Sequence, residues 1–217
     1  MASPFADILA ALARAFEHAG LRWYLFGAQA AIIHGAARLT ADVDVTVHLE
    51  GRPHETLVSA LNNTGFVLRV PDPEFVAQTR VLPVTHVPSG IPADIVLAGP
   101  GMEELFLARA KVFEVDGVRV PVACAEDIVV MKLLSGRAKD VDDVVAILAA
   151  HPDDLDLELV RSTIRMLEAA LDQSDLSPAL EHALAQARGT MGPSPARLPQ
   201  SANSKNRQKR TSRKGKR

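Results

Sequence analysis

The 217-residue sequence contains a single cysteine, Cys124, and no apolar run long enough to cross a membrane. One cysteine excludes a disulfide within the chain, and the N-terminus does not have the pattern of a secretory signal. We therefore expect a cytoplasmic protein, in a reducing compartment and without membrane insertion. Because no base lies near Cys124 in the sequence, we interpret this residue as part of the core and not as a nucleophile.

Several motifs of nucleotide and metal enzymes are also missing. The chain has no Walker A loop, no G-x-G-x-x-G dinucleotide fingerprint and no G-x-S-x-G motif. Its histidines at positions 34, 48, 54 and 86 lack H-E-x-x-H or Cys/His ligand spacing, which argues against a zinc site. What remains is a chain with 47% hydrophobic residues, enough for a sizeable core.

The most informative stretch runs from Tyr24 to Val47. Residues 42–47 alternate Asp or Thr with valine, which is the period of a half-buried strand. Alternate residues share a face, so Asp42 and Asp44 are expected to point the same way, with Cα atoms roughly 6.5–7 Å apart. Two such carboxylates repel each other, and a divalent cation such as Mg²⁺ would remove that cost. A solvated edge strand with a polar outer face is the alternative.

The residues before this strand predict a phosphate site. Residues 22–27 form a short β-prone run that ends in Gly27, and residues 28–35 form a short helix that ends in glycine. Gly27 and Ala28 would leave backbone N–H groups uncovered at the helix N-terminus, where a phosphate is favoured. The order strand, glycine turn, helix and D-x-D strand places a phosphate site beside a metal site.

This arrangement resembles the nucleotidyltransferase superfamily, which has the DNA-polymerase-β-like fold. The signature of that superfamily is Gly-Ser or Gly-Gly on the first helix, followed by Asp-x-Asp on the next strand. Gly27, Asp42 and Asp44 match it. Ala28 departs from the usual Ser or Gly, so the hydroxyl is missing and only backbone donors remain.

Two further residues extend the resemblance. Arg38 and Thr40 complete an R-x-T-x-D-x-D pattern, which is similar to the pattern of AbiEii-type and MenT-type nucleotidyltransferases from bacterial toxin–antitoxin systems. The resemblance implies that both residues contact the nucleotide.

The resemblance also implies a third carboxylate on a later strand, and Asp94 within residues 93–98, ADIVLA, fits that place. Neighbouring strands lie about 4.8 Å apart, so Asp94 can reach the first pair. By resemblance, Asp42 and Asp44 would ligate two Mg²⁺ ions, with Mn²⁺ as an alternative. Asp94 would ligate the second ion and accept the proton of the attacking hydroxyl. A lone aspartate near the start of a buried strand is the plainer interpretation.

A second informative stretch, 124–148, lies on two predicted helices. Lys132, Arg137 and Asp140 fall off the apolar face there. One interpretation is a solvated charged surface with an i,i+3 ion pair between Arg137 and Asp140. By resemblance to small nucleotidyltransferases, Lys132 would instead face the nucleotide phosphates as a mobile charge. Arg137 and Asp140 would brace the site, with Asp143 as a weaker member.

Hydrophobic periodicity and turn residues predict the remaining elements. Further helices are expected at 2–19, 53–63, 102–110, 125–134, 139–150, 156–171 and 178–188. Further strands are expected at 66–70 and 79–87, the latter interrupted by Pro83, with a turn at 71–73. Residues 111–122 should form a hairpin around Asp116-Gly117.

We therefore predict an α/β (α+β) fold, with a small mixed β-sheet of the polymerase-β type flanked by helices. The expected divisions are a catalytic core at 1–124, a helical C-terminal region at 125–189 and a disordered basic tail at 190–217.

The predicted tail carries a marked charge asymmetry. Residues 197–217 hold nine of the 24 Lys and Arg and none of the 26 Asp and Glu. Such a segment favours nucleic-acid contact that is salt-sensitive and sequence-blind, because it has no aromatic residue for base stacking. The alternatives are a tail that only keeps the protein in solution, and an end that is vector-derived or translated from another reading frame.

The function predicted from these motifs is transfer of a nucleotidyl group from a nucleoside triphosphate to a hydroxyl. By resemblance to the toxin enzymes, the acceptor would be RNA, such as a tRNA 3′ end, and an antitoxin protein would be a partner. A small-molecule or protein acceptor is the alternative. Ala28 favours a third interpretation, a nucleotidyltransferase fold kept as an inactive binding module.

Overall fold

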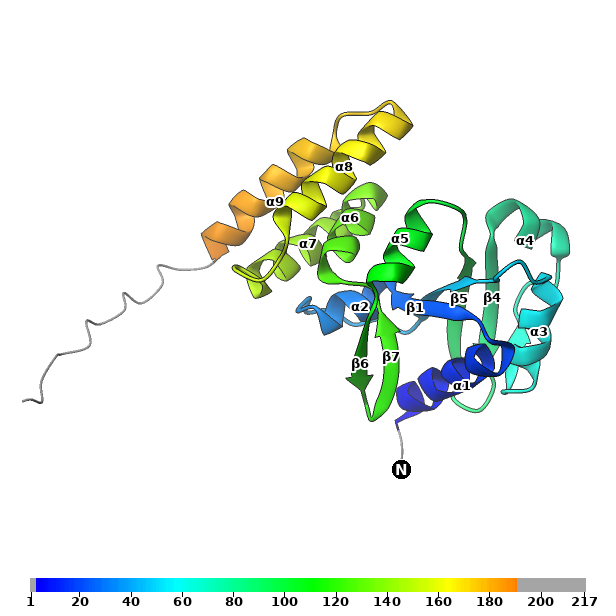
Figure 1. Cartoon of the computed structure of the whole chain (residues 1–217). Helices are drawn as coiled ribbons and strands as arrows, with labels where there is room; N and C mark the ends of the chain where they lie inside the picture. Colours follow the sequence, from blue (N-terminus) through cyan, green and yellow to red (C-terminus); the bar gives the residue numbers. More distant parts are fainter. Residues whose placement is uncertain (1–2, 191–217) are drawn as a thin grey trace, which may run out of the picture.

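The computed structural model describes residues 3–190 as a mixed β-sheet with helices around it (Figure 1). The strands are β1 (Arg22–Phe26), β2 (Val43–His48), β3 (Phe66–Leu68), β4 (Val81–His86), β5 (Ile91–Leu97), β6 (Lys111–Val115) and β7 (Val118–Val122). The helices are α1 (Pro4–Ala19), α2 (Gly27–Ile33), α3 (His54–Asn62), α4 (Pro73–Thr79), α5 (Met102–Arg109), α6 (Ala125–Ser135), α7 (Ala138–Ala150), α8 (Leu157–Leu171) and α9 (Leu176–Thr190).

The seven strands are ordered β3-β4-β5-β2-β1-β7-β6. β2 pairs in parallel with β5 and antiparallel with β1, and β1 pairs in parallel with β7. The outer pairs β3–β4, β4–β5 and β6–β7 are antiparallel. The centre of the sheet is therefore formed by β5, β2 and β1, which carry the residues that the sequence singled out.

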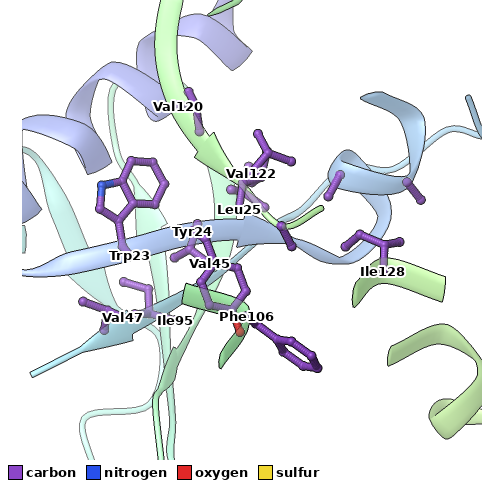
Figure 2. Close-up of a cluster of buried hydrophobic side chains, with 14 of the residues drawn as sticks. Trp23, Tyr24, Leu25, Val45, Val47, Ile95, Phe106, Val120, Val122 and Ile128 are labelled. Carbon is purple, nitrogen blue, oxygen red and sulfur yellow. The ribbon is translucent and has the colours of Figure 1, made fainter. Parts of the chain in front are cut away.

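The two faces of β2 have different roles. Val43, Val45 and Val47 are fully buried on one face. That face is covered by α1. Trp23, the register partner of Val47, packs against Phe16 of α1, with 5.0 Å between the centroids of the two rings. Figure 2 shows buried side chains on both faces of the sheet: Trp23 and Val47 lie on this face, whereas Tyr24 points toward Phe106 of α5 on the other. The aspartates of β2 consequently face the opposite side.

The predicted fold class is confirmed, and most predicted elements lie where periodicity placed them. The hairpin around Asp116-Gly117 is β6–β7, and Pro83 lies inside β4 without interrupting it. The predicted turn at 71–73 is wrong in part, because helix α4 begins at Pro73. Asp72 caps that helix by accepting the Glu74 N–H, so the Pro-Asp-Pro pattern starts a helix here.

One cluster of buried side chains runs from Ile8 to Ala187 and crosses the predicted boundary after residue 124. The division into a core and a helical region stays a prediction, and Figure 1 shows α6, α7, α8 and α9 gathered on one side of the sheet. Cys124 is buried, as expected for a core residue, and burial raises the pKa of its thiol. None of the helices within residues 3–190 has the length and apolar character of a membrane span. Of the predicted tail, residues 191–217 lie outside the described residues.

A buried ion pair joins α5 to α6. Asp127 is fully buried, and Arg109 donates two hydrogen bonds to its carboxylate at 2.6 and 3.1 Å. Burial nevertheless raises the pKa of Asp127, so the charged carboxylate depends on its arginine. This contact holds α5 beside the start of α6.

We expect Arg109→Met to lower the free energy of unfolding at pH 7 by about 3 kcal/mol, because it leaves a buried carboxylate without its cation. The loss of stability should shrink as pH falls, because Asp127 then takes up a proton and the neutral carboxyl no longer needs the arginine. Burial favours that protonated form and so raises the pKa of Asp127. Urea unfolding of Arg109→Met and of Arg109→Met/Asp127→Asn provides the measurement. The double variant should recover most of the loss, and a double variant as unstable as the single one would contradict the assignment.

Candidate functional site

Three aspartates lie near one another on the face of the sheet opposite α1. Asp44 of β2 and Asp94 of β5 are register partners on adjacent parallel strands, so their side chains lie on the same face. Asp42 directly precedes β2 and shares the alternation of Asp44. The structure therefore brings together the three residues that the sequence predicted as catalytic.

Asp44 is held against the start of α2. Gly27 has φ +67°, and a Cβ atom at that residue would lie 2.0 Å from Asp44 Oδ2, so only glycine fits this close approach. The Ala28 N–H donates to the Asp44 carboxylate. The predicted phosphate donors are thus beside the carboxylates, and in this conformation the Ala28 amide contacts Asp44.

The charge of Asp44 is poorly compensated. Burial is the largest effect on its carboxyl, and repulsion from Asp42 and Asp94 adds to it, so that the pKa is raised to about 6. The Ala28 hydrogen bond and the positive charge of Lys132 act in the opposite direction without cancelling the rise. A strongly perturbed carboxyl beside two others makes Asp44 a candidate functional residue.

The other two carboxylates have partners within the protein. The Thr40 hydroxyl donates to Asp42 Oδ1, and Arg69 donates to Asp94 Oδ1. Arg69 also bonds the carbonyls of Val84 and Ala93, which fixes it beside β4 and β5. Sequence reasoning missed Arg69, because only the β3-β4-β5 pairing shows that the residue after β3 reaches Asp94.

The predicted charged residues of α6 and α7 form one buried network. Lys132 Nζ donates to Asp140 at 2.8 Å and to Asp143 at 2.6 Å, and all three side chains are less than a tenth exposed. Arg137 bonds Asp140, and Arg38 Nη1 bonds Asp143 at 2.6 Å. The predicted i,i+3 pair of Arg137 and Asp140 is present.

This network corrects two expectations about α6 and α7. Lys132 and Asp140 are buried, so the solvated-surface interpretation is wrong for both. Lys132 is also held by two aspartates and is not a mobile charge. Burial works to raise the pKa of Asp140, but hydrogen bonds from Arg137, Lys132 and Ser135 hold it below its ordinary value.

The network faces the carboxylates. The charge of Lys132 acts on Asp44, and the charge of Asp44 acts on Arg137. Arg38 ties the segment before Asp42 to Asp143 of α7. The two informative stretches of the sequence thus meet at one place, where carboxylates lie beside guanidinium and ammonium groups.

The carboxylates have the chemistry of a site for a hard divalent cation. In this conformation no three His, Cys, Asp or Glu side chains between residues 3 and 190 are gathered closely enough to ligate one ion. Thr40 and Arg69 hold two of the three carboxylates. Within the described part of the chain, Asp44 has no cation bonded to it, and burial together with repulsion from Asp42 and Asp94 raises its pKa. Oxygen ligands with uncompensated charge fit Mg²⁺, provided that Asp94 exchanges Arg69 for the ion.

Gly27→Ala should destabilise the protein more than an alanine placed at an equally left-handed glycine with free space. Gly90 is the matched control, because its φ is +71° and a Cβ there would meet nothing within 4 Å. We expect Gly90→Ala to cost about 1 kcal/mol from backbone conformation alone. Gly27→Ala must also displace Asp44, and should cost clearly more in urea unfolding. Equal losses would show that Asp44 does not pack against residue 27.

The raised pKa of Asp44 predicts a pH-dependent stability in metal-free buffer. The protonated carboxyl stabilises the folded state fully below pH 3.8, and this contribution is lost as pH rises through about 6. Asp44→Asn removes the titration, so at pH 7 the variant should be more stable than the wild type by about 3 kcal/mol. At pH 4 the two proteins should differ little. Urea unfolding in EDTA at both pH values tests this, and a constant difference would contradict it.

Comparison with known structures supports the fold. The antibiotic-resistance factor ANT(2'')-Ia superposes with a TM-score of 0.52 at 16% identity, over 77% of this chain and 95% of that one. A nucleotidyltransferase-like antigenic protein from Paracoccidioides brasiliensis gives a TM-score of 0.51 at 18% identity, over 80% and 90% of the two chains. No curated protein sequence matches the chain at a significant level. A family profile, however, matches residues 7–177, and the chain therefore belongs to the family described as nucleotidyltransferases of unknown function, DUF6036.

Proposed function

We propose that the protein transfers a nucleotidyl group from a nucleoside triphosphate to a hydroxyl, with Mg²⁺ as the cofactor and Mn²⁺ as a substitute. The observation that carries this proposal is the register pairing of Asp44 with Asp94, with Asp42 beside them and the start of α2 against Asp44. This arrangement occurs in a chain of a nucleotidyltransferase family. The finer resemblance to AbiEii-type and MenT-type toxins still rests on the R-x-T-x-D-x-D pattern alone.

We assign the residue roles as the resemblance implies them, and the positions of the side chains support this assignment. Asp42, Asp44 and Asp94 would hold the metal, which when bound neutralises the phosphate oxygens and the developing charge. Asp94 would also accept the proton of the attacking hydroxyl. The acceptor oxygen forms a bond to the α-phosphorus, the bond from that phosphorus to the bridging oxygen breaks, and pyrophosphate leaves.

The cationic residues would bind the triphosphate. Arg137 is the most accessible of them, with a side chain 61% exposed, so it can turn toward a phosphate while Asp140 anchors it. Buried Lys132 contributes its charge through the network and keeps Asp140 and Asp143 in place. Arg38 and Thr40 hold the segment that carries Asp42. Gly27 and Ala28 supply the backbone of the predicted phosphate site.

Two classes of molecule are candidates for the acceptor of the nucleotidyl group. An RNA acceptor, such as a tRNA 3′ end, and an antitoxin partner rest on the toxin-like pattern and on the basic residues 197–217, which lie outside the described residues. One protein of similar fold carries the description of an antibiotic-resistance factor, which favours a small-molecule acceptor as the second candidate. The inactive binding module rests on Ala28 alone, and Mg²⁺-dependent thermal stabilisation by a triphosphate would argue against it.

Asp42→Asn is expected to abolish transfer while the protein stays folded, because Asp42 is exposed and an amide cannot replace a carboxylate as a metal ligand. The measurement incubates the protein with Mg²⁺ and each labelled triphosphate, together with total tRNA or a small-molecule extract. Asp116→Asn is the control, since this aspartate lies in the turn of the β6–β7 hairpin and asparagine tolerates its positive φ.

Incorporation of label that is lost in Asp42→Asn and kept in Asp116→Asn would establish the reaction. The molecule that carries the label would identify the acceptor class. A folded Asp42→Asn protein with full activity would refute the metal role of this residue. If Asp42→Asn unfolds, the aspartate is structural and the proposal loses its central ligand.

A further inference from the structure

A cavity of about 200 Å³ opens on the carboxylate face of the sheet, beneath α5, α6 and α8. Its floor is formed by Tyr24 and Phe26 of β1, Thr46 of β2 and Val96 of β5. Figure 2 shows the Tyr24 ring pointing from β1 toward Phe106 of α5, which is another wall of the cavity. The roles assigned above do not use this space.

The strand register places the cavity directly next to the carboxylates. Phe26 is the partner of Asp44, and Tyr24 is the partner of Thr46. Thr46 and Val96 are also register partners, two residues beyond Asp44 and Asp94 on the same face. The floor of the cavity therefore begins beside Asp44 and continues about 7 Å along the strands.

The groups that we propose bind phosphate lie on the other side of Asp44. Phe26, the register partner of Asp44, is the last residue of β1. The residues after it begin α2 and contact Asp44, whereas Tyr24, two residues before it, lies in the cavity. Arg38, Lys132 and Arg137 are not among the residues that line it. In an in-line displacement the attacking and leaving oxygens lie on opposite sides of the phosphorus. With pyrophosphate on the α2 side, the cavity is on the side of the acceptor.

The lining selects against a polyanion. Most of it is apolar, and its mouth includes Leu134 of α6, which is 44% exposed. The polar groups are the hydroxyls of Tyr24 and Thr46, which are bonded to each other, and the carboxylate of Glu103. No Lys, Arg or His is found among the described residues that line this cavity. A phosphate entering it would meet a carboxylate and no compensating cation.

We propose that this cavity binds the acceptor, and that the acceptor is a compact molecule with an uncharged, largely apolar body whose hydroxyl reaches Asp44 and Asp94. The proposal rests on the transfer reaction proposed above and names its substrate class. A volume of about 200 Å³ is smaller than the usual ligand pocket of about 300–1,000 Å³, which limits the body to about a single ring and excludes a strand of RNA.

The test uses 2-phenylethanol as a probe of an apolar body with a hydroxyl. Its binding to the full-length protein is followed by saturation-transfer NMR. Leu134→Trp fills the mouth of the cavity from a half-exposed position, and Leu134→Phe is a smaller second variant. Leu171→Trp is the matched control, because Leu171 is 51% exposed on α8 and does not line the cavity.

Saturable binding by the wild type that is at least fivefold weaker in Leu134→Trp or Leu134→Phe and unchanged in Leu171→Trp would support the proposal. Total tRNA should not displace the probe. Absent binding, equal binding in all variants, or displacement by tRNA would overturn it.

Thermal stabilisation by ATP with Mg²⁺, measured in the same proteins, separates this proposal from the transfer reaction. Unchanged stabilisation in the Leu134 variants supports an acceptor cavity, whereas its loss would assign the space to the nucleobase and overturn the proposal. If the wild type shows no stabilisation at all, the transfer reaction fails, and the probe result still reports separately on the cavity.

Discussion

The pairing of Asp44 with Asp94 on adjacent parallel strands is the constraint on which the site depends. The register places two carboxylates side by side, and Asp42 adds a third, so the centre of the sheet carries charges that repel one another. The repulsion is sustained because the opposite face of β2 is fixed by three fully buried valines. Strands packed in this way cannot slip without moving those valines out of the core.

The surrounding charges position this cluster more than they neutralise it. Lys132 joins Asp140 and Asp143 of α7, Asp143 holds Arg38, and Arg38 belongs to the segment that leads to Asp42. Buried ion pairs contribute little net stability, yet breaking one of them is costly. The helical region therefore fixes the position of the D-x-D segment, and the contacts join two stretches nearly a hundred residues apart.

Sequence reasoning succeeded where the signal is local and failed where it depends on distant pairing. The alternation at 42–47 and the Asp116-Gly117 turn predict β2 and the β6–β7 hairpin, because each pattern is read within a few residues. Arg69 could not be found in this way, since its contact with Asp94 requires the β3-β4-β5 order. The burial of Lys132 likewise depends on Asp143, eleven residues away on another helix.

The electrostatic strain at Asp44 bears on whether the fold is catalytic or only a scaffold. Burial and two neighbouring carboxylates raise the pKa of Asp44 to about 6, which means that its ionised form destabilises the folded protein. A binding module would gain stability by replacing Asp44 with a neutral residue. Ala28 argues less strongly for such a module than its sequence position suggests, because its N–H donates to Asp44 and so the backbone still performs a positioning role without a hydroxyl. Under the proposed transfer reaction, a bound divalent cation would relieve the cost of ionising Asp44.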